Sequence, residues 1–201
     1  MGTAPLLTTI EAAHALREGA VLAIPTDTVY GLACDPSNTV AVDRIYAIKG
    51  RPASLELTLM GGTWEDVRKE CIPTPEAELL AAAYLPGPLA LVLPVQESRS
   101  YVVPRSGSTV AVRVPDHEVI RELCQYAGLL ATTSANPHGL PAAQSLGEVQ
   151  EYLGDSIDGV LAGECAFGVA STIIDCTSNP VHILRTGPIS FDDIHAVIAK
   201  T

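Results

Sequence analysis

Short apolar runs alternate along the chain with segments whose apolar residues recur at helical spacing. The runs that are bounded by turn residues predict strands at 20–24, 55–60, 89–94, 110–114, 129–133, 160–161, 172–176 and 182–185. The helical segments are 9–18, 39–48, 63–70, 75–84, 116–127, a helix that follows 145 and ends near 154, and a last helix that begins after 190. The last three strands are short and closely spaced, so we expect partly antiparallel pairing. The pattern predicts a single α/β domain over residues 1–201, with a twisted sheet of mixed parallel and antiparallel strands flanked by helices.

Polar residues mark where several helices begin. Thr8-x-x-Glu11 has the spacing of a capping box, Ser145-x-x-Glu148 caps a second helix, and Ser190-x-x-Asp193 opens the last one. Thr74 precedes Pro75, which places proline at the first helical position. These caps support the predicted helix starts independently of the apolar pattern.

In two of the predicted strands, apolar and polar residues alternate so that one face of the strand is polar. In residues 109–114 the three valines share one face, whereas Thr109, Ala111 and Arg113 share the other. Thr132 and Ser134 lie two apart at the end of another strand. A half-solvated sheet face would explain each strand alone. Two such strands near loops rich in proline or glycine favour a concave ligand site.

The strongest candidate for such a site follows the first apolar run. Residues 20–24 end in Pro25-Thr-Asp-Thr-Val-Tyr-Gly31, and Lys49-Gly-Arg-Pro52 follows about one helix later. A buried strand that ends in hydroxyls and a carboxylate is a common place for ligands in open α/β proteins, and two cations could meet the ligand's anionic part. Purely structural roles also remain open for these residues. Lys49 and Arg51 could be favourable charges at a helix C-terminus, and residues 134–137 could form an ordinary turn. Arg185 could simply end a strand, and Ser171 could cap the start of one.

Composition and charge narrow the class of protein. The 201 residues are 47% hydrophobic and 17% charged, which fits a globular chain of one large or two small domains. No run approaches the roughly 18 apolar residues of a membrane span, and residues 1–5 lack the features of a signal peptide, so we expect a cytoplasmic protein with no membrane partner. A net charge of −11 argues against stable nonspecific binding to nucleic acid.

Several familiar site motifs are absent from the sequence. The five cysteines are scattered without a Cys-x-x-Cys, which favours reduced, mostly buried thiols, and the five histidines do not fall at metal-ligand spacing. There is no P-loop and no Gly-x-Gly-x-x-Gly. Ser134, His138 and an aspartate could suggest a hydrolase, but the Gly-x-Ser-x-Gly elbow is missing.

Seven motifs together resemble the YrdC/Sua5/TsaC family, in that family's order and across residues 8–190. They are Pro25-Thr-Asp-Thr-Val-Tyr-Gly-Leu32, Lys49-Gly-Arg-Pro52, Pro86-Gly-Pro-Leu89, Thr109-Val-Ala-Val-Arg-Val-Pro115, Ser134-Ala-Asn136, Ser171-Thr-Ile-Ile-Asp175 and Ile183-Leu-Arg185. The resemblance implies a single-domain enzyme that makes L-threonylcarbamoyladenylate from L-threonine, bicarbonate and ATP and releases pyrophosphate. It also implies that the product passes to a tRNA threonylcarbamoyl transferase complex for the t6A modification.

The resemblance implies a role for each candidate residue. Lys49 and Arg51 would be catalytic and would face the ATP phosphates, with Mg2+ held through those phosphates and by no protein ligand. The implied ATP-binding set is Lys49, Arg51, Leu55, Thr109, Ser134, Asn136, Ala142 and Arg185. The implied threonine-binding set is Thr28, Met60, Arg113, Thr132 and Ser171, with Arg113 suited to a carboxylate.

The chain departs from the family pattern at several positions. Glu56 replaces a proline, Met60 a histidine, His138 and Ala142 two serines, Leu85 a tryptophan and Ala90 a threonine. Two alternatives therefore stay open. One is a divergent relative that forms another carbamoyl adenylate, and the other is a nucleotide- or RNA-binding module without catalysis.

Overall fold

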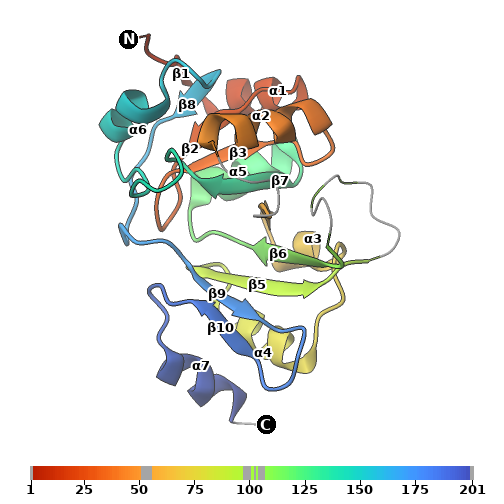
Figure 1. The fold of residues 1–201 in the computed structure, drawn as a ribbon. Coiled ribbons are helices and arrows are strands. Elements are labelled where there is room, and N and C mark those ends of the chain that lie inside the picture. The colour runs from red at the N-terminus through yellow and green to blue at the C-terminus, as the bar shows by residue number, and fades with distance from the viewer. Residues whose placement is uncertain (1, 51–55, 97–100, 102, 104–106, 200–201) are drawn as a thin grey trace.

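The strands form one mixed sheet in the computed structural model, which describes residues 2–50, 56–96, 101, 103 and 107–199. Within these residues ten strands run in the order β1-β8-β2-β3-β7-β4-β6-β5-β9-β10 (Figure 1). The strands are β1 (Leu6–Leu7), β2 (Leu22–Ile24), β3 (Gly31–Cys34), β4 (Thr58–Met60), β5 (Leu89–Pro94), β6 (Thr109–Arg113), β7 (Leu130–Ser134), β8 (Gly159–Leu161), β9 (Thr172–Asp175) and β10 (His182–Arg185). Parallel pairs such as β4–β6 stand beside antiparallel pairs such as β5–β6, so the predicted mixed α/β sheet is confirmed.

Helices flank both faces of this sheet. They are α1 (Thr9–Arg17), α2 (Thr39–Lys49), α3 (Trp64–Arg68), α4 (Pro75–Tyr84), α5 (Glu118–Ala127), α6 (Leu146–Leu153) and α7 (Phe191–Ile198). The predicted caps are present: Thr8 and Ser190 complete capping boxes, and the Thr74 hydroxyl accepts from the Ala77 N–H. Within the described residues, no helix is long and apolar enough to cross a membrane.

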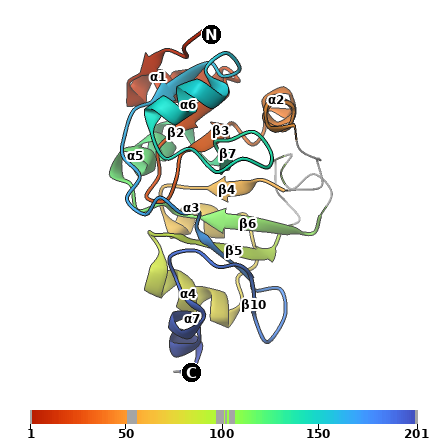
Figure 2. The same cartoon turned by 60° about the vertical axis from the view of Figure 1, so that its left-hand side comes forward.

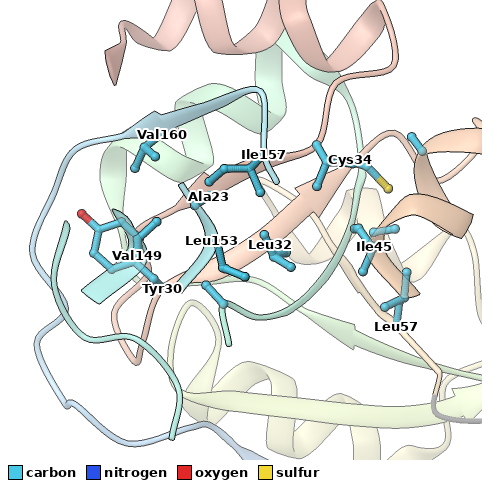
Figure 3. Packing of buried hydrophobic residues seen from close by; sticks show 14 of the residues in the cluster. Ala23, Tyr30, Leu32, Cys34, Ile45, Leu57, Val149, Leu153, Ile157 and Val160 are labelled. Carbon is cyan, nitrogen blue, oxygen red and sulfur yellow. The ribbon is translucent and has the colours of Figure 1, made fainter. Parts of the chain in front are cut away.

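One face of the sheet is covered from end to end. Helices α2 and α6 pack on β2, β3 and β7, where Leu32, Ile45 and Leu153 belong to one buried cluster (Figure 3). Helices α3, α4 and α7 cover the half that holds β5 and β6 (Figure 2). Leu57 belongs to the first cluster and Leu59 to the second, and their spacing of two puts both on this face.

The opposite face is only partly covered. Helices α1 and α5 pack against each other and bury Leu22, Ile24 and Leu130 beneath them. The rest of this face carries the residues that line a cavity. The arrangement therefore leaves one stretch of sheet, centred on β4 and β6, open to a ligand.

Two short strands were not predicted from the sequence, and one prediction needs a qualification. The loop expected to run on from Pro25 gives way to β3 at Gly31, and β1 consists of two leucines just before α1. The antiparallel pairing expected among the last strands is confirmed for β9 and β10. β8 instead pairs in parallel with both β1 and β2, because the chain crosses the sheet before β9.

Candidate functional site

A cavity of about 460 Å³ opens on the uncovered part of the sheet. Its floor comes from β4, β5, β6, β7 and β9, and its sides come from the loop after β2 and from the segments around Ser171 and Arg185. The loop after β2 contributes Thr26 and Thr28, as expected from the hydroxyl cluster that follows this strand. The cavity thus unites segments that lie far apart in the sequence.

Strand register explains how the polar faces of the strands meet. Thr58 of β4 pairs with Ala111 of β6 on one side and with Thr132 of β7 on the other. Met60 pairs with Arg113 in the same way. Residues that are directly paired share a face of the sheet, so β4 joins the two polar faces that the alternation predicted. Val110, Val112 and Val114 pack into the core on the other side, which confirms the predicted division of this strand.

Arg113 is the most firmly held cation of the cavity. Its Nη2 donates to Asp27 Oδ1 at 2.6 Å, its Nη1 donates to Thr28 Oγ1 at 2.9 Å, and its Nε donates to the Gly87 carbonyl at 3.2 Å. The side chains of Arg113 and Asp27 are only 7% and 3% exposed. Burial lowers the pKa of Arg113, the Asp27 carboxylate opposes that shift, and the charge of Arg185 adds to it. Arg113 stays charged because a guanidinium is not deprotonated in proteins and the Asp27 carboxylate is its buried counter-ion.

Arg185 reaches the cavity from β10. Its Nε donates to the Ser171 carbonyl at 2.8 Å, and its Nη2 donates to Ser171 Oγ at 3.1 Å. Burial lowers the pKa of this guanidinium. The resemblance groups Arg185 with the nucleotide and Ser171 with threonine, whereas the structure brings the two residues into direct contact.

Lys49 lies behind the cavity wall, at the end of α2, and is 4% exposed. Its Nζ donates to the carbonyls of Ser134 and Asn136 at 2.6 and 2.9 Å and to Asn136 Oδ1 at 2.9 Å. Asn136 Oδ1 also accepts from Ser134 Oγ at 2.6 Å, and Asn136 Nδ2 donates to the Leu140 carbonyl at 2.6 Å. Lys49 and Asn136 therefore hold the 134–140 turn in one conformation and present Ser134 at the cavity.

The other candidate residues are placed as follows. Thr132 and Met60 line the cavity, and Thr132 Oγ1 donates to the Thr58 carbonyl at 3.1 Å. Thr109 shares the cavity-facing side of β6 but lies beyond the residues that form the cavity wall, and Ala142 lies in the half-buried loop before α6. Arg51 and Leu55 lie outside the described residues.

Asp27 holds a cavity residue, Arg113, and sequence reasoning left it without a role. Its carboxylate was recognisable in the polar cluster after the first strand, but its partner Arg113 lies 86 residues away. Glu56, noted only as a departure from the family pattern, also lines the cavity.

The loop that carries Asp27 and Thr28 is fastened by a second loop. Phe167 N donates to the Asp27 carbonyl and Gly168 N to the Thr28 carbonyl, each at 2.9 Å. Tyr30 Oη donates to the Gly163 carbonyl at 2.7 Å and accepts from the Gly163 N–H at 3.0 Å. A Cβ at position 163 would lie 2.6 Å from Pro25 Cγ, so the close approach requires glycine. These bonds hold the polar loop against the sheet.

The chemistry of the cavity is that of a binding site for a small anionic molecule. Two guanidiniums and several hydroxyls converge on it, and guanidiniums pair well with carboxylates and phosphates. Among the described residues, no group of three His, Cys, Asp or Glu side chains could hold a metal ion. Fold and site together define an α/β protein with a cavity, lined by two guanidiniums, on the open face of a mixed sheet.

The chain belongs to the Sua5/YciO/YrdC family. The model of this family, which is described as "Telomere recombination", matches residues 14–187. A threonylcarbamoyl-AMP synthase of Pyrococcus abyssi is 39% identical over 192 residues, which cover 94% of this chain and 56% of that protein. A threonylcarbamoyl-AMP synthase of Pseudomonas paraeruginosa is 42% identical over 154 residues, which cover 76% of this chain and 83% of the relative. The family resemblance stated from the motifs is thereby confirmed.

Solved structures agree with this assignment. The crystal structure of P. abyssi Sua5 complexed with L-threonine matches 98% of this chain with a TM-score of 0.89 and 36% identity. This chain spans only 60% of that Sua5 chain. E. coli YciO matches with a TM-score of 0.81 at 22% identity, which supports the fold alone.

Proposed function

We propose that this protein is an L-threonylcarbamoyladenylate synthase, which uses L-threonine, bicarbonate and ATP. The observation that carries the proposal is Arg113, a buried guanidinium that Asp27 and Thr28 hold at a cavity. Such a group suits the α-carboxylate of an amino acid, and the neighbouring hydroxyls suit an amino acid whose side chain carries a hydroxyl. Two relatives named threonylcarbamoyl-AMP synthase, at 39% and 42% identity, support the same activity.

The reaction needs positioning and charge neutralisation. The threonine amine and bicarbonate form a carbamate, one carbamate oxygen attacks the α-phosphorus of ATP, and pyrophosphate leaves. Both partners in the second step are anions, so the site must hold them in line and offset their charges. Arg113 and Arg185 provide positive charge inside the cavity, and Lys49 fixes the turn that presents Ser134. Arg51 would add a further cation by its place in the Lys49–Pro52 motif.

Mg2+ is proposed to enter with the ATP phosphates. Glu56 is the one acidic side chain that lines the described part of the cavity. Mg2+ usually keeps several waters and takes one or two carboxylates together with substrate phosphates, so these residues fit a metal held mainly by ATP. When bound, the ion would neutralise charge on the phosphates.

A different acceptor of the carbamoyl group is the second candidate. Met60 is buried, lines the cavity and pairs with Arg113 across the sheet. The resemblance implies a histidine there, so this wall offers a thioether in place of a polar ring. An acceptor with a more apolar side chain than threonine would gain from that change.

A product assay distinguishes these candidates. The protein is incubated with ATP, Mg2+, bicarbonate and one amino acid at a time, while pyrophosphate and the adenylate mass are followed. Threonine should give the fastest bicarbonate-dependent release, with valine and serine as probes of the hydroxyl and the methyl. Faster release with valine would favour the second candidate. ATP binding without release for any acceptor would refute both candidates and leave a nucleotide-binding module.

We place the product in the cytoplasm, where a tRNA threonylcarbamoyl transferase complex would consume it for the t6A modification. The product is a mixed anhydride of a carbamate and a phosphate, which water hydrolyses. Coupled incubation with that complex and tRNA would test the transfer directly. The expected outcome is t6A formation that depends on threonine and on this protein.

A further inference from the structure

His117 is a half-buried histidine that the proposed reaction leaves without a role. It is the N-cap of α5, but its side chain makes no capping hydrogen bond. Its backbone carbonyl accepts from the N–H groups of Ile120 and Arg121 instead. Its Nδ1 is buried and has no hydrogen-bond partner of normal geometry among the described residues. The start of α5 therefore needs the backbone of His117 but not its ring.

The ring packs against the 163–168 loop. A Cβ on Gly163 would lie 2.6 Å from Pro25 Cγ and 3.4 Å from His117 Nε2, so the proline ring and the imidazole together close this side of Gly163. Gly163 also exchanges two hydrogen bonds with Tyr30 Oη. His117 thus contacts the 163–168 loop at the residue where Tyr30 fastens it.

The same loop continues to the polar loop of Asp27 and Thr28. The N–H groups of Phe167 and Gly168 donate to the carbonyls of these two residues, each at 2.9 Å. The side chains of Asp27 and Thr28 in turn accept from Arg113 at 2.6 and 2.9 Å. A displacement of the 163–168 loop would therefore reach the guanidinium in the cavity through two backbone hydrogen bonds.

A positive charge on His117 opposes this packing. Burial lowers the pKa of His117, whereas the Asp27 charge, hydrogen bonding to the Glu164 backbone and the Asp116 charge oppose the shift. Asp27 belongs to the polar loop and Asp116 precedes α5, and the Cys165 thiol of the 163–168 loop has its own pKa raised by burial, so it stays neutral. Because the packed arrangement disfavours the charged ring, protonation favours an arrangement in which the ring is hydrated.

We propose that His117 is a positioning residue: its neutral ring clamps the 163–168 loop against the polar loop of Asp27 and Thr28, and its protonation releases this clamp. His117 is not among the described residues that line the cavity, so it acts on Arg113 through the two loops. The clamp itself does not depend on the substrate. Its effect on turnover rests on the proposed function, and that effect is a loss of activity at acidic pH.

Amide hydrogen exchange, followed by NMR on isotope-labelled protein, measures the clamp directly. Protection factors, which correct for the intrinsic exchange rate at each pH, are determined for Phe167 and Gly168 at pH 7.5 and pH 5. The variants are His117→Gln, which keeps a polar nitrogen near the place of Nε2 but takes up no proton, and His117→Ala, which removes the ring. Ile72, whose N–H donates to a carbonyl of β5 at 2.8 Å, reports any general loss of stability. His195→Gln, at an exposed histidine of α7, is the matched control.

In the wild type and His195→Gln, protection of Phe167 and Gly168 should fall at least about threefold more than that of Ile72 between pH 7.5 and pH 5. His117→Gln should keep its protection at both pH values, and His117→Ala should lack it at both. Constant protection in the wild type, a wild-type fall in His117→Gln, or wild-type protection in His117→Ala overturns the proposal.

Threonine-dependent pyrophosphate release tests the consequence for catalysis. Turnover of the wild type relative to His117→Gln should be lower at pH 5 than at pH 7.5, because only the wild type loses the clamp. An unchanged ratio overturns the positioning role of His117. If the exchange data are as expected and no acceptor gives pyrophosphate release at either pH, the proposed function is refuted while the clamp stands.

Discussion

Asp27→Asn should destabilise the protein strongly, because it removes the counter-charge of a buried guanidinium while keeping the shape of the side chain. Removing one partner of a buried ion pair costs about 3–5 kcal/mol. The amide oxygen of the new side chain could still accept from Arg113 Nη2, so we expect the lower end, about 3 kcal/mol. For a chain of 201 residues this corresponds to a fall in Tm of about 6–12 °C.

Urea denaturation followed by circular dichroism measures this loss. Asp158→Asn is the matched control, since Arg44 and Asp158 also approach to 2.6 Å but their side chains are 39% and 37% exposed. The control should lose at most about 1 kcal/mol. The double variant Asp27→Asn/Arg113→Gln should lose less than the sum of the two single variants, because no lone charge remains buried. If Asp27→Asn loses no more than Asp158→Asn, the charge of Asp27 does not hold Arg113.

The 134–136 turn, the cap of α4 and the half-buried imidazole of His117 each give a further prediction. Lys49→Ala should lower turnover at least about 100-fold and also lower Tm, because the 134–136 turn loses the four hydrogen bonds that Nζ donates to it; pyrophosphate release and thermal melting check this, and a variant with wild-type turnover would contradict it. Thr74→Ala should lower the free energy of unfolding by about 1 kcal/mol, because the Ala77 N–H loses the acceptor that caps α4; urea titration measures this, and no change in the midpoint would refute the role of the cap. Burial lowers the pKa of His117 below its usual 6.5. The unfolded chain therefore binds a proton at this position more readily than the folded chain does. As a result, the stability that His117 contributes falls as the pH drops through about 6.5. Tm measured from pH 7.5 to 5 should therefore decline less steeply in His117→Asn, and parallel profiles would argue against that linkage.

Local signals predicted the elements of the fold well, whereas strand order lay beyond them. The capped helices and the strand at 89–94 appear with nearly the predicted bounds, because caps and apolar periodicity act within a few residues. β3 was missed because Gly31–Cys34 is short and its first residue, Gly31, continues the polar loop that begins at Pro25. The position of β4 between β6 and β7 depends on contacts across more than 50 residues of sequence, which no local pattern reports.

The candidate site divides in the same way. Alternation along β6 was enough to place Arg113 and Ala111 on a ligand face. Arg113 pairs with Asp27, and Arg185 pairs with Ser171, only through the tertiary fold. The sequence therefore identified these side chains but not which of them would be in contact. Lys49 was expected at the phosphates, but the structure shows it bonded to the turn that carries Ser134. Its helix-end position is compatible with either arrangement, so sequence alone could not decide between them.

One face of β6 lines the cavity and the other packs into the core, and this restricts how the segment can change in evolution. A substitution at Ala111 alters only the cavity, and one at Val112 alters only the core. An inserted or deleted residue would shift the alternation by one position, so that Arg113 would be driven into the apolar layer and a valine would face the ligand. β6 is paired on both sides, with β4 and β5, so neither neighbour can absorb the shift at a free edge. This stretch can therefore vary in composition but not in length, whereas loops away from the sheet are free to lengthen.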